Sequence, residues 1–200
     1  YMTMQMAIKD FATQFDYEPV IENKDSFRPA EKFILNGMGG SHLAADLLKV
    51  ARPKLDFRVF EAYGLPAVPE GEEKDFLFIA SSYSGNTEEA VDFAHEVHEK
   101  GLNLAIIATG GQLIDFAQAN NLAYIQMPNT GIQPRSALGF AIVALAKMTG
   151  DKTLCGELHP LAEILKPNTL EAQGKQLAET LRGKVPVIYS STRNHSVAYN

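Results

Sequence analysis

The chain has 200 residues, 46% of them hydrophobic and 21% charged, which is the balance of an ordinary folded globular protein. Its 18 basic and 24 acidic residues give a formal net charge of −6, and without a basic stripe no nucleic-acid partner is expected. A single cysteine excludes an intramolecular disulfide, and no apolar run of the sequence has the length of a bilayer span, so no membrane partner is expected and a cytoplasmic location is favoured.

Residues 1–30 are expected to form an N-terminal helical extension of a larger domain. Apolar residues recur at helical spacing over Thr3–Phe15, which predicts one amphipathic helix that packs on that domain. The chain begins with Tyr1 and not with methionine, which favours an incomplete amino terminus. The apolar face of the predicted helix consists of Met6, Ile8, Phe11, Ala12 and Phe15.

A strand at Lys32–Asn36, a glycine-rich turn and a helix form the first predicted unit of the main domain. The turn places the hydroxyl of Ser41 at the helix start, where it can face a ligand. Gly37 and Gly39 also match the beginning of a dinucleotide-binding fingerprint. His42 stands where that fingerprint needs its third glycine, so a nicotinamide cofactor is not expected.

Four more apolar runs alternate with helical patterns up to residue 150. Residues 31–150 are therefore predicted to form a doubly wound, three-layer, flavodoxin-like α/β domain with a mostly parallel five-stranded sheet. Ligands are expected at the carboxyl ends of its strands. The other predicted strands are Phe57–Tyr63, Phe76–Ala80, Leu104–Ala108 and Tyr124–Met127, and the later helices are Glu88–Lys100, Ile114–Ala119 and Ser136–Met148.

The stretch Asp75–Gly101 carries the clearest functional signal. Its buried strand is followed by a small turn with Ser82, Ser84 and Thr87, and then by a helix. Hydroxyl groups and the unpaired N–H groups of a helix start thus gather in one small volume, which suits a phosphate group. Because one hydroxyl is enough to cap a helix, simple capping by Thr87 or Ser84 is the alternative interpretation.

Arg135 follows Pro134 at the head of a long apolar helix. The helix dipole disfavours a cation at this end, so the arginine is expected to have an anionic partner. That partner is either a bound anion or a carboxylate of the protein, and the sequence leaves both alternatives open.

The chain after residue 150 is expected to leave the main domain. Residues 151–183 are predicted to form a helical linker with two prolines. Val185–Ser190 is again an apolar run of β type, followed by the beginning of a helical pattern. Residues 184–200 are therefore interpreted as the start of a second domain that is truncated in this chain.

Four motifs, in their order and spacing, resemble those of sugar isomerase (SIS) domains. More narrowly, they are similar to the bifunctional phosphoglucose/phosphomannose isomerases of bacteria and archaea. The match covers about Phe33–Met148 and resumes at Val185–Tyr189, where that family begins its second SIS domain. The motifs are Gly37–Ser41, Ser82–Glu89, Gly110–Leu113 and Gln133–Gly139.

The resemblance implies an aldose–ketose isomerase of carbohydrate metabolism, in glycolysis or gluconeogenesis, that interconverts glucose 6-phosphate or mannose 6-phosphate with fructose 6-phosphate. It implies no metal, no organic cofactor and a homodimer. Ser82, Ser84 and Thr87 would hold the phosphate of this hexose 6-phosphate, and Gly40 and Ser41 would close on the sugar. A non-catalytic SIS module that senses a phosphosugar is the alternative.

Arg135 is the catalytic residue that the resemblance implies, because a fixed cation stabilises the negative charge of an enediolate intermediate. The family's general base, a glutamate, and its ring-opening histidine are expected beyond residue 200, so this chain alone should be nearly inactive. His42 stands where the family usually has glycine, which predicts a narrower pocket.

Overall fold

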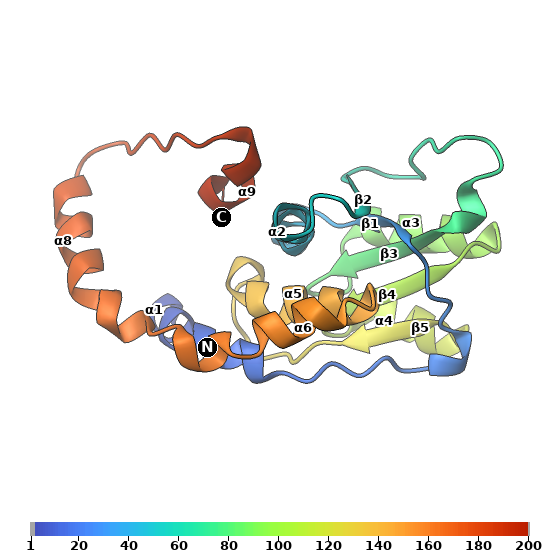
Figure 1. Ribbon diagram of the computed structural model, residues 1–200, viewed down its shortest axis with the longest axis horizontal. Helices are drawn as coiled ribbons and strands as arrows, with labels where there is room; N and C mark the ends of the chain where they lie inside the picture. The colour runs from blue at the N-terminus through green and yellow to red at the C-terminus, as the bar shows by residue number, and fades with distance from the viewer. Residues whose placement is uncertain (1–2, 200) are drawn as a thin grey trace.

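The computed structural model describes residues 3–199 and has a single five-stranded sheet at its centre (Figure 1). The strands are β1 (Lys32–Asn36), β2 (Asp56–Phe60), β3 (Phe76–Ser82), β4 (Leu104–Ala108) and β5 (Ala123–Gln126). All neighbouring strands are parallel, and their order is β2-β1-β3-β4-β5. The direction of winding reverses between β1 and β3, which is the switch point where ligands bind in such sheets. The predicted fold class is confirmed, with a sheet that is wholly parallel.

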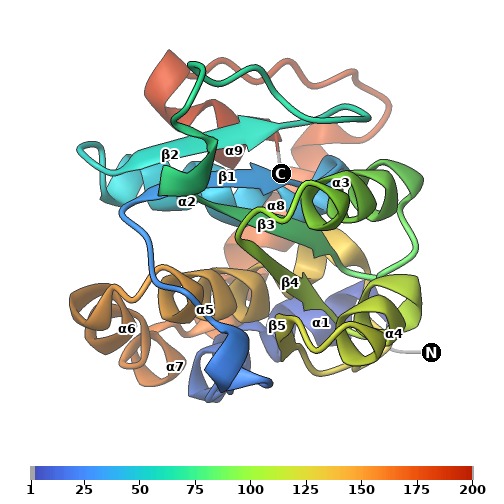
Figure 2. The ribbon, with the colours of Figure 1, turned by 90° about the vertical axis from the view of Figure 1, so that its right-hand side faces the viewer.

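Helices cover both faces of the sheet. In Figure 2, α3 and α4 lie on one side of the strands, and α5 and α6 lie on the other. The α-helices are α1 (Met4–Lys9), α2 (Leu43–Ala51), α3 (Glu88–Glu99), α4 (Gly111–Ala119), α5 (Leu138–Met148), α6 (Lys152–Leu158), α7 (Leu161–Ile164), α8 (Glu171–Leu181) and α9 (His195–Tyr199). Short 3₁₀ turns include η1 (Phe11–Asp16), η3 (Gly39–Ser41) and η5 (Pro134–Ala137).

Two hydrophobic cores hold these layers together, one on each face of the sheet. Alternate side chains of β3 enter opposite cores: Leu77 and Ile79 pack in the core of α2, α5 and α6, whereas Phe76 and Phe78 pack in the core of α3 and α4. A strand that is buried on both faces is a continuous apolar run, which is why β3 was clear in the sequence. Each such side chain stabilises the fold by about 1.5–3 kcal/mol through burial.

The N-terminal extension differs from the prediction of one amphipathic helix. The chain forms only the short helix α1 before η1 begins, and Met6 and Ile8 are 51% and 56% exposed. Ala12 and Phe15 of the predicted apolar face are buried, and so is Gln14, which is 3% exposed. The Gln14 Oε1 atom accepts N–H groups of Gly139 and Phe140 at 2.9 and 3.2 Å. The extension thus caps the start of α5, and this buried polar contact fixes the backbone in place of a longer helix.

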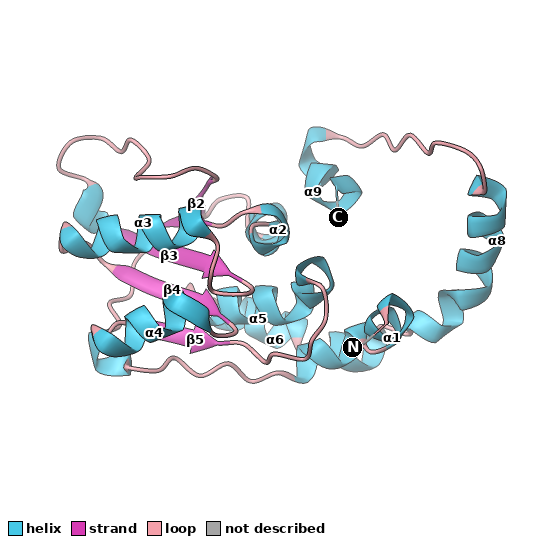
Figure 3. Ribbon diagram, turned by 180° about the vertical axis from the view of Figure 1, so that it is seen from behind, coloured by secondary structure: helices cyan, strands magenta, loops and turns pink. Residues whose placement is uncertain are grey.

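Residues 165–199, here called the C-terminal arm, leave the domain and curve back to it. Figures 1 and 3 show α8 set apart from the sheet and α9 lying beside α2. The predicted β run at Val185–Ser190 forms no strand within the described residues, and its apolar side chains are exposed. A strand needs a neighbour for its hydrogen bonds, and residues 3–199 supply none there. None of the helices among residues 3–199 is both long and apolar enough to cross a membrane.

Candidate functional site

Three hydroxyl groups meet at the carboxyl end of β3 and are called the hydroxyl cluster. Ser82 Oγ lies 2.8 Å from Thr87 Oγ1 and 3.5 Å from Ser84 Oγ. Ser82 is fully buried, whereas Thr87 is half-buried and Ser84 is exposed. The fold therefore brings together the three side chains predicted to bind phosphate, with Ser82 beneath the two that reach the surface.

The hydroxyl cluster is not used to cap α3. Thr87 is the N-cap residue, but its side chain makes no cap hydrogen bond to any described residue. Its Oγ1 atom faces Ser82, and Ser84 Oγ accepts the N–H of Asn86 at 3.2 Å, outside the helix. The capping interpretation is therefore wrong. Because the first N–H groups of an α-helix lack partners within it, α3 directs its donors and positive dipole end toward the cluster.

The turn after β4 holds the hydroxyl cluster in place. Gly85 has a φ of +73°, which side chains rarely adopt, and a Cβ atom there would overlap the carbonyl oxygen of Gly110. The N–H of Leu113 donates to Gly85 O at 3.0 Å. Thr109 Oγ1 donates to Tyr83 O at 2.6 Å, a support that sequence reasoning missed. The Gly110–Leu113 motif thus acts by fixing the Ser82–Thr87 turn.

The turn after β1 lies between the hydroxyl cluster and Arg135. Ser41 Oγ accepts the N–H of Tyr83 at 3.1 Å, and Ser81 Oγ donates to Ser41 O at 3.3 Å. Gly40 packs against η5 so closely that an added Cβ atom would lie 3.0 Å from Arg135 N. All predicted site residues therefore belong to adjoining turns at the carboxyl edge of the sheet, although the Ser41 hydroxyl already has a partner in the fold.

Among the described residues, Arg135 contacts the C-terminal arm and no carboxylate. Its Nη1 atom donates to Tyr199 O at 2.8 Å, and its guanidinium carbon lies 4.8 Å from the centre of the Tyr199 ring. The ion pairs described for residues 3–199 do not include Arg135. The structural salt bridge, one of the two alternatives for this residue, is therefore not observed, and the positive charge remains available to an anion.

His42 occupies a position between two carboxylates. Its Nδ1 atom lies 2.9 Å from Asp46 Oδ2, its Nε2 atom lies 3.3 Å from Glu61 Oε2, and the residue is only 8% exposed. The spacing of four residues between His42 and Asp46 in a helical pattern was a signal for this contact, whereas nothing local pointed to Glu61.

Two acids of α3 bond to the loop after β2. Tyr63 OH donates to Glu88 Oε2 at 3.1 Å, and this hydrogen bond raises the pKa of the Tyr63 phenol. Asp92 Oδ2 accepts the N–H of Gly64 at 2.8 Å. Residues 3–199 contain no group of three or more His, Cys, Asp and Glu side chains that could bind a metal ion. The arrangement therefore offers hydroxyls, amides and one arginine, which suit an anionic ligand.

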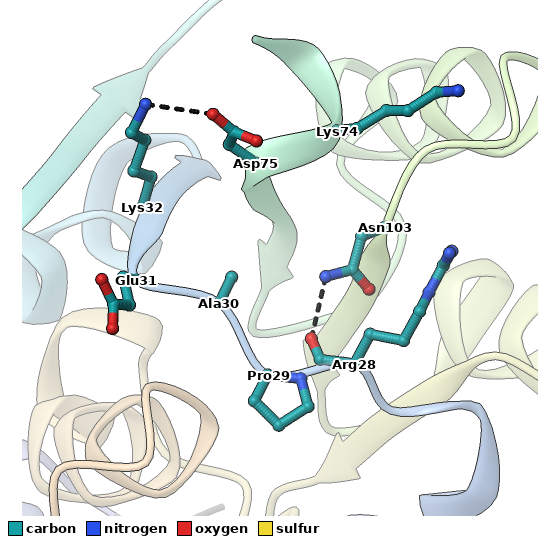
Figure 4. Close-up of a pocket in the computed structure, with 8 residues that line it drawn as sticks. All are labelled: Arg28, Pro29, Ala30, Glu31, Lys32, Lys74, Asp75 and Asn103. Atoms are coloured by element: carbon teal, nitrogen blue, oxygen red, sulfur yellow. Dashed lines mark hydrogen bonds and ion pairs between the residues drawn. The ribbon is translucent and has the colours of Figure 1, made fainter.

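A pocket of about 530 Å³ lies at the opposite edge of the sheet (Figure 4). Lys32 Nζ lies 3.2 Å from Asp75 Oδ2 across it, and Asn103 Nδ2 donates to Arg28 O at 2.8 Å. Its lining residues are Arg28, Pro29, Ala30, Glu31, Lys32, Lys74, Asp75 and Asn103. Acidic and basic groups are mixed here, and ligands of parallel sheets bind at the carboxyl edge, so the candidate site is the hydroxyl cluster and its surroundings.

The chain is 34% identical over 175 residues to the bifunctional phosphoglucose/phosphomannose isomerase of Caldicellulosiruptor bescii, a match that covers 80% of this chain and 50% of that protein. This chain is a homologue of these isomerases. The Aquifex aeolicus isomerase of the same name is 29% identical over 198 residues, 96% of this chain and 59% of that protein. The resemblance found in the sequence is thus confirmed, and no protein-family model matches the chain.

The chain spans about half the length of the isomerases it matches. A solved structure with the same fold is the C-terminal domain of glucosamine-fructose-6-phosphate aminotransferase from Francisella tularensis, with a TM-score of 0.65 and 17% identity over 98% of this chain and 64% of that one. This likeness concerns the fold alone.

Proposed function

We propose that this chain is the phosphate-binding part of a phosphoglucose/phosphomannose isomerase acting on hexose 6-phosphates. The observation that carries the proposal is the hydroxyl cluster, in which Ser82, Ser84 and Thr87 converge at the start of α3. The Thr87 side chain makes no cap hydrogen bond to a described residue. Homology to isomerases of that name supports the reaction class.

The phosphate would bind to the hydroxyls of the exposed Ser84 and the half-buried Thr87 and to the leading N–H groups of α3, with Ser82 orienting Thr87 from below. Gly40 and Ser41 would border the sugar, since their turn lies between the cluster and Arg135. No lysine takes part, so hydroxyl and amide donors compensate the phosphate charge.

The reaction moves a proton between neighbouring carbons of the open-chain sugar. A base removes the proton from C2 of the aldose, and the electrons form an enediolate with its charge on O1. The hydroxyl proton of O2 then passes to O1, and a proton returns at C1 to give the ketose. Arg135 would stabilise the oxyanion. Its guanidinium has five N–H donors, and Tyr199 O accepts from Nη1, so donors on the other nitrogens can reach the oxyanion. We place the base and the ring-opening histidine outside this chain, in a second domain starting near residue 184, and expect the homodimer of a cytoplasmic enzyme.

A phosphosugar sensor is the second candidate, since binding by the hydroxyl cluster requires no base. A test that separates the two is turnover of fructose 6-phosphate by a longer protein that contains this chain. A sensor would bind the sugar phosphate with the same dependence on Ser84 but show no exchange of the C1 proton with solvent.

Titration of the 200-residue chain with fructose 6-phosphate, followed by calorimetry, tests the binding proposal directly. The change Ser84→Ala should weaken binding by about 1–3 kcal/mol, the contribution of a charge-assisted hydrogen bond. Ser191→Ala is the matched control, because Ser191 is an exposed serine of the arm with no cap hydrogen bond to a described residue. Equal affinity of the two variants would remove Ser84 from the site.

A further inference from the structure

Helix α9 lies against the candidate site although it comes from the far end of the described chain. It contacts α2, and both Figure 1 and Figure 3 show the two helices side by side. Tyr199 provides the contact to Arg135, through its carbonyl oxygen at 2.8 Å and its ring centre at 4.8 Å. We propose that Tyr199 is a positioning residue, which holds the Arg135 guanidinium at the sugar end of the bound phosphosugar. This inference rests on the proposed function.

An exposed arginine needs such a support. Its long side chain has many rotamers, and without a support the binding of a ligand would have to offset the conformational entropy lost when the side chain is ordered. A guanidinium stacked on an aromatic ring keeps the N–H donors in its plane for other partners. Tyr199 O accepts from Nη1, so other donors of Arg135 can meet an anion. The ring of Tyr199 therefore orients the charge without neutralising it, which a carboxylate in the same place would do.

Two histidine rings stack on the Tyr199 ring. The His42 ring is stacked on it with centres 6.5 Å apart and planes at 29°, and the His195 ring lies 5.9 Å away at 12°. His42 in turn is held between Asp46 and Glu61. A continuous series of contacts therefore runs from two carboxylates through His42 and Tyr199 to Arg135. The histidine that departs from the family's usual glycine supports this tyrosine and is not simply a group that narrows a pocket.

Binding of two probes to the 200-residue chain tests the inference. The probes are 5-phospho-D-arabinonate, whose carboxylate carries charge where the enediolate would, and inorganic phosphate, which needs only the hydroxyl cluster. Tyr199→Leu should weaken binding of the phosphoarabinonate about five- to tenfold and leave the phosphate affinity unchanged. Tyr199→Phe retains the ring and the backbone carbonyl and should bind both probes as the parent chain does.

Two controls separate positioning from a general effect on the arm. Tyr189→Leu removes a tyrosine of the same arm that is 91% exposed, and should change neither affinity. In an Arg135→Ala background, Tyr199→Leu should have no further effect on phosphoarabinonate binding, because the group that it positions is gone. Additive losses in that double variant would overturn the inference.

The outcomes also distinguish this inference from the proposed function. If the parent chain prefers phosphoarabinonate to phosphate and Tyr199→Leu keeps the full preference, the positioning role is refuted and the proposed function stands. If the parent chain binds neither probe, the proposed function fails and the role of Tyr199 fails with it. A melting curve of Tyr199→Leu that matches the parent chain confirms that any loss is not unfolding.

Discussion

The turn Ser82–Thr87 and the C-terminal arm both contribute to the candidate site, but the chain holds them by different means. In the turn, neighbouring polar groups bond one another, and the Gly85 backbone is fixed by the turn after β4. In the arm, every residue of α8 is at least partly exposed, and Val185 is 90% exposed. The hydroxyl cluster is thus built within the domain, whereas the contact of Arg135 with Tyr199 depends on a few contacts of α9.

This difference has a consequence for stability. A segment fixed by many short-range hydrogen bonds opens only when the domain unfolds, whereas a segment held by few contacts opens locally at a small free-energy cost. Substitutions in the turn should therefore change the free energy of unfolding of the domain, and comparable substitutions in the arm should not. Variants at Gly85, Gly174, Asp151 and Leu177 test how firmly each region is held, from the largest expected effect to the smallest.

The largest effect is expected for Gly85→Ala. The added Cβ atom would overlap the carbonyl oxygen of Gly110, and the φ of +73° strains any residue other than glycine. We expect a loss of about 3 kcal/mol or more in the free energy of unfolding, measured by urea denaturation. Phosphate binding should be lost as well, because the turn must move.

Gly174→Ala is the matched control in the arm. Gly174 lies inside α8, and its added Cβ atom would meet no described atom within 4 Å. Alanine is the better helix former by about 0.5–1 kcal/mol, so α8 should become more helical by circular dichroism while the domain is unchanged. An equal destabilisation by both variants would contradict the contrast between the two regions.

An intermediate effect is expected at Asp151, where the domain passes into its last helices. Asp151 Oδ1 caps α6 through the N–H of Leu154 at 2.8 Å, and Oδ2 accepts from Arg52 Nε at 2.7 Å. Asp151→Ala should lower the free energy of unfolding by about 1–2 kcal/mol, measured by denaturant titration. Asp151→Asn keeps a capping oxygen and should cost less.

The same carboxyl should make stability depend on pH. Burial acts to raise the pKa of Asp151, but the N–H of Leu154 and the guanidinium of Arg52 outweigh it and lower the pKa below the ordinary value. Its contribution is therefore fully present above the pKa of an unfolded aspartate, about 4, and is lost as the pH falls through the lower folded pKa. The difference between the parent chain and Asp151→Asn should shrink as acid is added below pH 4, and a constant difference would refute this.

The smallest effect is expected for Leu177→Ala in α8. Leu177 is 59% exposed, so its truncation removes little buried surface. The change in the free energy of unfolding should stay within about 0.5 kcal/mol, in contrast to the roughly 2–5 kcal/mol of a buried leucine. A loss of more than about 1 kcal/mol in the same denaturant titration would show that the arm packs as firmly as the domain.

Local sequence was enough to predict the parts of this protein that form from residues close together in the chain. The apolar run of β3 predicts a strand because both faces are buried, and the hydroxyl cluster lies within six consecutive residues, so one turn brings it together. The extension shows the limit: helical spacing predicted that Met6 and Ile8 would be buried, but both are exposed, and the polar Gln14 packs at the start of α5.

The sequence by itself determined the order of strands and helices, the fold class and the place of the Ser82–Thr87 turn, because periodic burial and turn chemistry act over a few residues. Only the tertiary structure decided which partners meet across long stretches of chain: Arg135 with Tyr199, and His42 with Glu61. It also left Val185–Ser190 without a strand partner among residues 3–199. A side chain's distant neighbour is fixed by how whole elements pack, and no local pattern of residues records that packing.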